Sequence, residues 1–290
     1  MTLRLLGGIR EIAPQYDGFI LDLWGVLHDG MAPFPGVLEA LTELKSAGKR
    51  VAVLSNAPRR AALVAERMSE IGIPAALYDH IHSSGEEAWR HLQQRDDPFH
   101  AALGRVCYHI GPARDDNMLA GTDLRRVAGI DEAEFILNTG PSDWDETVEQ
   151  YEPLLQGALA RALPMVCANP DLVVIHGGRR SICAGAVAQR YEMLGGRVRW
   201  HGKPYPSVYA ACFALLGIAD RRRILAVGDS LRTDIAGANA AGIDSVLVTA
   251  GIHAHEFGLD AGSEPDLARI AQGIAASGAA PTAVIAHFCW

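Results

Sequence analysis

Three polar side chains stand where apolar segments of the sequence end: Asp22, Ser55 and Asp229. Lys203 lies in a Gly-Lys-Pro segment, and Asp234 follows Asp229 by five residues. A carboxylate can attack phosphorus and carry the phosphoryl group covalently. The incoming phosphate repels that carboxylate, so a lysine and a divalent cation must offset the charge. Each acid alone is typical of a turn or helix cap, but the joint set predicts phosphoryl chemistry.

The acidic pair in this set suits a magnesium ion. Asp229 and Asp234 offer hard oxygen ligands, and Mg²⁺ takes one or two protein carboxylates beside a substrate phosphate. Ser55 and the backbone amides after Asp22 can donate hydrogen bonds to phosphate oxygens. We therefore expect Mg²⁺ as the cofactor.

Parallel strands are the elements that would bring these residues together. Apolar runs at 18–24, 50–56, 223–229 and 245–249 read as buried strands, and amphipathic helical segments follow the first two. This alternation predicts an α/β fold with a parallel sheet. Ligands in such sheets bind beyond the carboxyl ends of the strands, so Asp22, Ser55 and Asp229 are expected to converge.

The middle of the chain has strand and helix candidates of its own. Strands are expected at 106–110, 134–137 and 164–167, and a helix at 145–161. The core sheet resumes afterwards, so this segment is predicted to be an insertion. We expect a core domain of residues 1–80 and 201–290, with an inserted domain of residues 81–200.

Composition restricts the classes of partner. The 290 residues carry a net charge of −8, which argues against a large contact with nucleic acid or an anionic membrane surface. The five cysteines are scattered singly and odd in number, which favours reduced thiols. The N-terminal segment has charges within its first ten residues, and no run of 18 uncharged apolar residues occurs. A cytoplasmic protein is predicted.

Four motifs in order resemble the haloacid dehalogenase-like hydrolase superfamily. They are Asp-Leu-Trp-Gly-Val-Leu from Asp22, Ser-Asn from Ser55, Lys203 in His-Gly-Lys-Pro, and the segment from Gly228-Asp229 to Asp234. The resemblance spans nearly the whole chain. It implies a doubly wound, Rossmann-like parallel sheet as the core.

The segment between the second and third motifs resembles one subfamily. Its length, the Ser-Asn pair, Gly-Lys-Pro followed by Tyr209, and Ala-Asn-Pro-Asp at 168–171 before Cys-Ala-Gly-Ala at 183–186 are similar to the NagD kind of nucleotide and sugar-phosphate phosphatases. This implies an inserted α/β cap of the C2 type. It also implies a small phosphorylated metabolite as substrate, and leaves room for a homodimer.

The resemblance assigns a role to each matching residue. Asp22 would be the nucleophile and a metal ligand, Ser55 a phosphate donor and Lys203 the charge clamp. Asp229 and Asp234 would support the metal, together with the backbone carbonyl of Trp24. The residues expected to contact substrate are Trp24, Gly25, Asn56, Asn169 and Asp171. For Asn169 and Asp171, a simple Pro-Asp turn is an equal alternative.

One position departs from the family pattern. Active phosphatases of the family carry a second Asp two residues after the nucleophile, as acid for the leaving group and base for water, and this chain has Trp24 there. An indole cannot exchange that proton, and losing a positioned acid or base costs roughly 10²–10⁴ in rate. His28 and Asp29 are candidates to replace it, although a turn after the strand is the simpler interpretation of both.

Two functions therefore stay open on the sequence. One is a Mg²⁺-dependent phosphatase acting through an aspartyl-phosphate, slowed by the missing acid. The other is a non-hydrolytic protein that binds phosphorylated ligands. Two other segments favour simpler interpretations: His253-Ala-His-Glu256 as surface histidines, and Arg59-Arg60 as solvated charge at a helix start.

Overall fold

The computed structural model describes residues 3–176, 179–259 and 266–290. The chain forms two compact units, each with its own sheet. The first comprises Met1–Ser55, Ala65–His82 and Lys203–Trp290, and the second Asn56–Val64 and Ser83–Gly202. Among the described residues, no helix is both long and apolar enough to cross a membrane.

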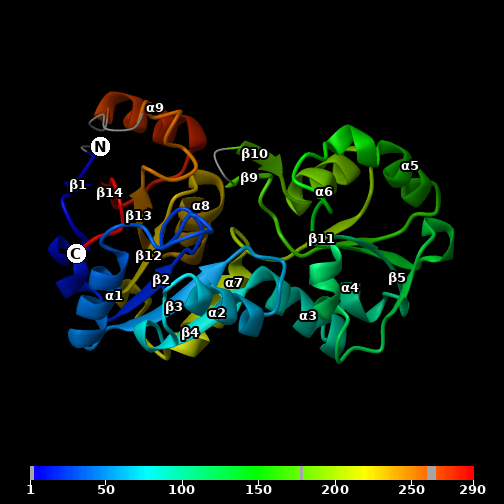
Figure 1. Cartoon of the computed structure of the whole chain (residues 1–290), viewed down its shortest axis with the longest axis horizontal. Coiled ribbons are helices and arrows are strands. Elements are labelled where there is room, and N and C mark those ends of the chain that lie inside the picture. Colours follow the sequence, from blue (N-terminus) through cyan, green and yellow to red (C-terminus); the bar gives the residue numbers. More distant parts are fainter. Residues whose placement is uncertain (1–2, 177–178, 260–265) are drawn as a thin grey trace. The chain divides into compact units, whose positions relative to one another are not determined.

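The first unit is built on a seven-stranded sheet with the order β1-β14-β13-β12-β2-β3-β4 (Figure 1). The pairs from β1 through β3 in this order are parallel. The strands are β1 (Leu5–Leu6), β2 (Gly18–Leu21), β3 (Arg50–Ser55), β4 (His80–Ser83), β12 (Ile224–Gly228), β13 (Asp244–Val248) and β14 (Ala283–Ile285). The helices of this unit are α1 (Val37–Ser46), α7 (Pro206–Leu216), α8 (Ala236–Ala241) and α9 (Leu267–Ser277), and α2 (Ala61–Glu70) crosses the boundary of the two units.

Both faces of this sheet are buried, which explains why its strands are continuous apolar runs. On one face, Ile20, Ala52 and Ala226 pack with residues of α7 and α8. Their neighbours along the strands, such as Leu21 and Val53, point to the opposite face and are also buried. The prediction of a doubly wound α/β core with a parallel sheet is confirmed.

The second unit has a five-stranded parallel sheet with the order β11-β8-β7-β5-β6. Its strands are β5 (Val106–Ile110), β6 (Arg125–Val127), β7 (Phe135–Asn138), β8 (Met165–Cys167) and β11 (Val198–Trp200). Two further strands, β9 (Val173–His176) and β10 (Arg179–Ile182), pair antiparallel. Its helices are α3 (Ser84–Gln94), α4 (Pro98–Ala101), α5 (Glu152–Ala160) and α6 (Ala184–Met193). Figure 1 draws this unit in cyan to yellow-green.

The structure corrects one predicted helix. The expected helix at 145–161 is a short 3₁₀ turn at Val148–Tyr151 followed by α5, which begins only at Glu152. Thr147 and Gln150 form a reciprocal capping box that starts the turn, and Pro153 occupies the first turn of α5. Proline is tolerated there because the first amides of a helix have no partner inside the helix.

Candidate functional site

The carboxyl ends of β2 and β12 carry the two acids that the sequence singled out. Asp22 follows β2 directly and Asp229 follows β12, the adjacent strand. Asp234 lies on a π-helical turn, Leu231–Ile235, that begins two residues after Asp229. Each of these three buried acids offers a carboxylate oxygen within 4.8 Å of the other two. The convergence expected of Asp22 and Asp229 is what the structure shows.

Lys203 is the cation of this acidic set, Asp22, Asp229 and Asp234. Its buried Nζ donates to Asp22 Oδ1 at 2.5 Å and to Asp234 Oδ1 at 2.7 Å. One ammonium thus faces three carboxylates. The arrangement leaves an excess of buried negative charge when all three acids are ionised.

The titration of two of these acids reflects that excess. Burial raises the pKa of Asp22 above its usual range, and the Asp234 carboxylate adds to the effect while Lys203 opposes it. Burial, together with Asp22 and Asp234, raises the pKa of Asp229 well above its usual value. Burial is the main cause of both shifts and the neighbouring acids add to it, and a divalent cation would supply the opposing positive charge.

Backbone amides and small residues hold the acids in place. Ile252 N donates to Asp229 Oδ2 at 2.8 Å, and Ser230 N donates to Asp234 Oδ2 at 3.1 Å. Gly25 has a φ of +85°, and a Cβ atom there would lie 2.0 Å from Asp229 Oδ2. Gly25 thus makes room for Asp229, and its expected contact with substrate stays a prediction.

Ser55 is the last residue of β3 and belongs to the first unit. Asn56 follows it and belongs to the second unit. Ser55 is buried at the carboxyl end of the strand next to β2. Asn56 Nδ2 donates to Asp171 Oδ1 at 2.9 Å within the second unit. Asp171 N in turn donates to Asn169 Oδ1 at 2.9 Å, so Asn169 and Asp171 form the turn that the sequence offered as one alternative.

Trp24 lies in a tight loop after Asp22. Its half-buried ring contacts His28 edge-on, with ring centres 5.4 Å apart. A Cβ atom at Gly30 would come within 2.3 Å of Trp24 Cη2, so the indole covers this glycine.

His28 and Asp29, the candidates to replace the missing acid, serve the same loop. Gly30 N donates to His28 Nδ1, and Met31 N and Ala32 N donate to Asp29 Oδ1. Burial lowers the pKa of His28 to about 4, so its imidazole is neutral at neutral pH. These contacts are those of turn residues, the simpler interpretation of both side chains.

The remaining segments are more buried and more often paired than the simpler interpretations predicted: His253 is 19% exposed, and Arg59 and Arg60 are 35% and 26% exposed. His253 Nδ1 contacts Glu256 Oε2 at 2.7 Å, within the loop after β13. Arg59 and Arg60 bind acids of the second unit, Asp115 and Glu86. No disulfide joins the five cysteines, all of which the structure describes.

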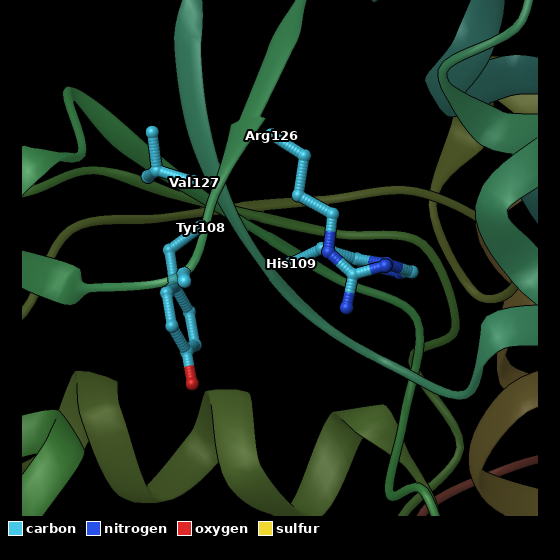
Figure 2. A pocket seen from close by; sticks show the side chains of 5 residues that line it. Tyr108, His109, Arg126 and Val127 are labelled. Atoms are coloured by element: carbon cyan, nitrogen blue, oxygen red, sulfur yellow. The ribbon is translucent and has the colours of Figure 1, made fainter.

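A separate pocket of about 460 Å³ lies on the second unit, at the paired strands β5 and β6. Figure 2 shows Arg126 and His109 extending together on one side and Tyr108 and Val127 on the other. Arg126 Nη1 donates to Asp116 Oδ1 at 2.6 Å, so this arginine is already paired. None of the lining residues belongs to the acidic set.

Sequence reasoning missed the residues that position the acids. Ile252 and Ser230 act through backbone amides, which leave no signature in residue type. Tyr209, noted only as part of a motif, donates from its hydroxyl to the Asp234 carbonyl at 3.0 Å. The glycine at 251 was the one available signal, since a Cβ atom there would lie 2.2 Å from Asp229 Oδ2.

The chain belongs to the haloacid dehalogenase-like hydrolase family. A model of haloacid dehalogenase-like hydrolases matches residues 19–125, and a second, HAD-hydrolase-like model matches residues 200–276. A solved structure of a haloacid dehalogenase-like hydrolase from Brucella suis is 31% identical, with a TM-score of 0.82, and the match covers 99% of this chain and 100% of that one. The predicted superfamily is confirmed.

Two curated relatives match most of the chain, and one of them is named a phosphatase. Chronophin of Mus musculus is 30% identical over 87% of this chain and 88% of its own length. D-glycerol 3-phosphate phosphatase of Mycobacterium tuberculosis is 30% identical over 84% of this chain, which spans 66% of that protein. The prediction of a hydrolase acting on phosphoric monoesters is confirmed at the level of the family and its named relatives.

Proposed function

We propose that the chain is a Mg²⁺-dependent phosphatase of small phosphorylated metabolites that works through an aspartyl-phosphate on Asp22. The observation that carries this proposal is the position of Asp22, buried beside Lys203 and within 4.8 Å of Asp229 and Asp234. A carboxylate at a strand end, next to an ammonium and two further acids, can attack phosphorus once the negative charge is balanced.

The residues present fit a magnesium ion. The three carboxylates are oxygen donors, which Mg²⁺ prefers, and a cation would offset the burial and mutual repulsion that raise the pKa values of Asp22 and Asp229. Asp22, Asp229 and Asp234 would hold it, with the Trp24 backbone carbonyl as a further ligand. When bound, Mg²⁺ would neutralise charge on the phosphate. In support, a solved glycerol phosphate phosphatase from Mycobacterium tuberculosis is in complex with magnesium (25% identity, TM-score 0.64, 83% of this chain and 70% of that one).

The proposed reaction has two displacement steps, and the residues of this chain have different roles in them. An Asp22 oxygen forms a bond to phosphorus while the ester P–O bond breaks and the alcohol oxygen leaves with the electron pair. Water then attacks the phosphorus of the aspartyl-phosphate, releasing inorganic phosphate and restoring the Asp22 carboxylate. Lys203 and Ser55 would bind phosphate oxygens throughout. Trp24 supplies no proton to the leaving group, so we expect slow turnover on poor leaving groups.

Trp24 also favours a second candidate function. A protein that keeps the acidic set but lacks the usual acid and base could bind phosphorylated ligands without turning them over. The cap role of residues 81–200, substrate contacts by Asn56, Asn169 and Asp171, the cytoplasmic location and a homodimer stay predictions.

A phosphate-release screen separates the two candidates. The wild-type chain and Asp22→Asn are assayed on a panel of aryl and alkyl phosphomonoesters, with Mg²⁺ and with a chelator. Asp131→Asn, which changes an exposed acid, is the matched control. The proposal expects Mg²⁺-dependent release that Asp22→Asn abolishes and the control keeps. Ligand binding with no release on any ester and no phosphorylated Asp22 would favour the binding protein.

A further inference from the structure

The loop after β13 is hydrogen-bonded, at two adjacent residues, to the segment that carries Asp229 and Asp234. Ile252 N donates to Asp229 Oδ2 at 2.8 Å, and the next residue, His253, accepts at its Nε2 from Leu231 N at 3.3 Å. Leu231 is the first residue of the π-helical turn that carries Asp234. One loop therefore holds one acid directly and also holds the start of the turn that bears the other acid.

The hydrogen bond from Leu231 defines the state of the His253 imidazole. A backbone N–H can only donate, so Nε2 of the ring accepts with its lone pair and carries no hydrogen. The ring hydrogen is then on Nδ1, which lies 2.7 Å from Glu256 Oε2. His253 is therefore a neutral imidazole, and Glu256 selects the tautomer whose Nε2 is able to accept.

The turn needs an acceptor at this position. The first amides of a helical segment have no acceptor inside the segment. In this turn, the Ser230 hydroxyl accepts from Thr233 N at 3.3 Å, and Ser230 O accepts from Asp234 N at 3.0 Å. Leu231 is buried, and His253 is the acceptor for its amide. Because a buried amide without an acceptor is costly, the orientation of the turn depends on the imidazole.

Apolar packing holds the ring against the turn. Phe257, from the same loop, is buried in one cluster with Leu231 and Ile235, which are the two ends of the turn. The rings of Phe257 and His253 have their centres 5.5 Å apart, and Phe257 N donates to His253 O at 3.0 Å. The loop and the turn thus pack together, and the imidazole is fixed in place between them.

The turn determines where the Asp234 carboxylate lies. Its Oδ2 accepts from Ser230 N at 3.1 Å, and its Oδ1 accepts from Lys203 Nζ at 2.7 Å. Asp229 is held separately, by the amide of Ile252. A shift of the turn would therefore change the separation of the two acids. That separation matters for Mg²⁺, which demands a nearly ideal octahedral arrangement of its ligands.

We propose that His253 is a positioning residue for the acidic set. Its Nε2 holds the turn that carries Asp234 in place relative to Asp229, and Glu256 keeps the imidazole in the tautomer that this role needs. The inference rests on the proposed function, because it takes the acidic set to be the cation site. His253 and Glu256, spaced like metal ligands in the sequence, act on the turn instead.

Magnesium affinity of His253 variants tests this role. His253→Ala removes the acceptor, His253→Gln places an amide oxygen near the position of Nε2, and the shorter His253→Asn does not reach it. His255→Ala, which removes an exposed histidine of the same loop, is the matched control. In calorimetric titration of metal-free protein, we expect the Kd for Mg²⁺ to rise roughly 10–100-fold in His253→Ala and His253→Asn. His253→Gln and the control should bind as the wild type does.

Amide exchange of Leu231, followed by NMR without metal, reads the hydrogen bond directly. Exchange should be faster in His253→Ala and His253→Asn, and should keep its wild-type rate in His253→Gln and His255→Ala. This measurement does not depend on Mg²⁺. If the wild type bound no Mg²⁺ and released no phosphate, the proposed function would fail, and the exchange rates alone would decide whether His253 holds the turn.

Three results would overturn the inference. They are unchanged Leu231 exchange in His253→Ala, wild-type Mg²⁺ affinity in that variant, and a loss of affinity in His253→Gln as large as in His253→Asn. An equal loss in His255→Ala would assign the effect to the loop as a whole and overturn it too. If His253→Ala fails to fold, the comparison of His253→Gln with His253→Asn still decides, because both variants carry the same amide group.

Discussion

Gly25 and Asp229 approach so closely that a Cβ atom at Gly25 would lie 2.0 Å from Asp229 Oδ2. The glycine belongs to the loop after β2, and the acid follows β12, the adjacent strand. The first motif therefore contributes more than Asp22. It also supplies the space in which a second acid of the set is held.

Gly25→Ala should lower activity by about 10²-fold, because an added methyl group must displace the Asp229 carboxylate by about an ångström. Gly48→Ala is the matched control, since Gly48 also has a positive φ, of +71°, but no atom lies within 4 Å of its Cβ position. Both variants should lose about 1–2 kcal/mol of unfolding free energy from backbone strain. Steady-state kinetics and urea unfolding separate the two effects, and equal activities would contradict this account.

Asp229→Asn should abolish the stabilisation by Mg²⁺ without lowering the stability of the metal-free protein. Three buried carboxylates face one lysine, so removal of one charge relieves repulsion. For the wild type, Mg²⁺ at a hundred times its Kd should add about 2.7 kcal/mol. Thermal unfolding without Mg²⁺ measures the stability of the metal-free protein, and unfolding with Mg²⁺ measures the added stabilisation. Asp131→Asn is the control. A Mg²⁺-induced shift that survives in Asp229→Asn would place the ion elsewhere.

The metal-free wild type should lose stability relative to Asp22→Asn as the pH rises above about 4, whereas the buried His28 and His100, whose pKa values are lowered to about 4, act in the opposite direction in both proteins. The pKa of Asp22 is raised in the folded state, whereas its unfolded value is near 3.9, so the folded state holds the proton more tightly. The free energy of unfolding then falls with rising pH up to the folded pKa. Urea unfolding between about pH 5 and 8 with a chelator should show the decline, and Mg²⁺ should reduce it. An equally steep decline in Asp22→Asn would assign it to other groups.

Sequence predicts those parts of this molecule whose structure follows from a short stretch of residues. The strands β2, β3 and β12 are continuous apolar runs, and parallel strands end at the same edge of a sheet, so the meeting of Asp22 and Asp229 follows. The strand β4 is hidden by its polar sequence His-Ile-His-Ser, and β1 spans only two residues.

The grouping of His91, His100 and His201 illustrates what sequence alone does not predict, because their ring centres lie 5.0–5.3 Å apart. In the sequence, His91 and His100 are nine positions apart, and His201 lies a further 101 positions along. The three meet because α3 and α4 pack near the end of β11, which depends on the packing of the whole second unit. Sequence also does not reveal that Ile252 holds Asp229, because the donor is the backbone amide and not the side chain.

On the proposed mechanism, Trp24→Asp should supply acid and base catalysis that the indole of Trp24 cannot provide. The wild-type leaving group would then depart without a proton, so aryl phosphates should be cleaved in preference to alkyl phosphates. A carboxylate at position 24 could protonate alkyl leaving groups and activate water, for a gain of up to roughly 10²–10⁴. The realised gain should be smaller, because loss of the indole removes its contacts with His28 and Gly30 and leaves a void.

Trp24→Asn is the matched control, because it has the same shape as the aspartate variant and leaves the same void but carries no exchangeable acid. Rates on aryl and alkyl esters are compared for the three proteins with Mg²⁺ present. We expect Trp24→Asp to cleave alkyl esters faster than Trp24→Asn does. The two variants should cleave aryl esters at similar rates, because aryl leaving groups need little protonation. Equal wild-type rates on both ester types, with no gain in Trp24→Asp, would mean that another group transfers the proton. His28→Ala and Asp29→Ala would then identify it, since these two side chains lie in the same loop as Trp24.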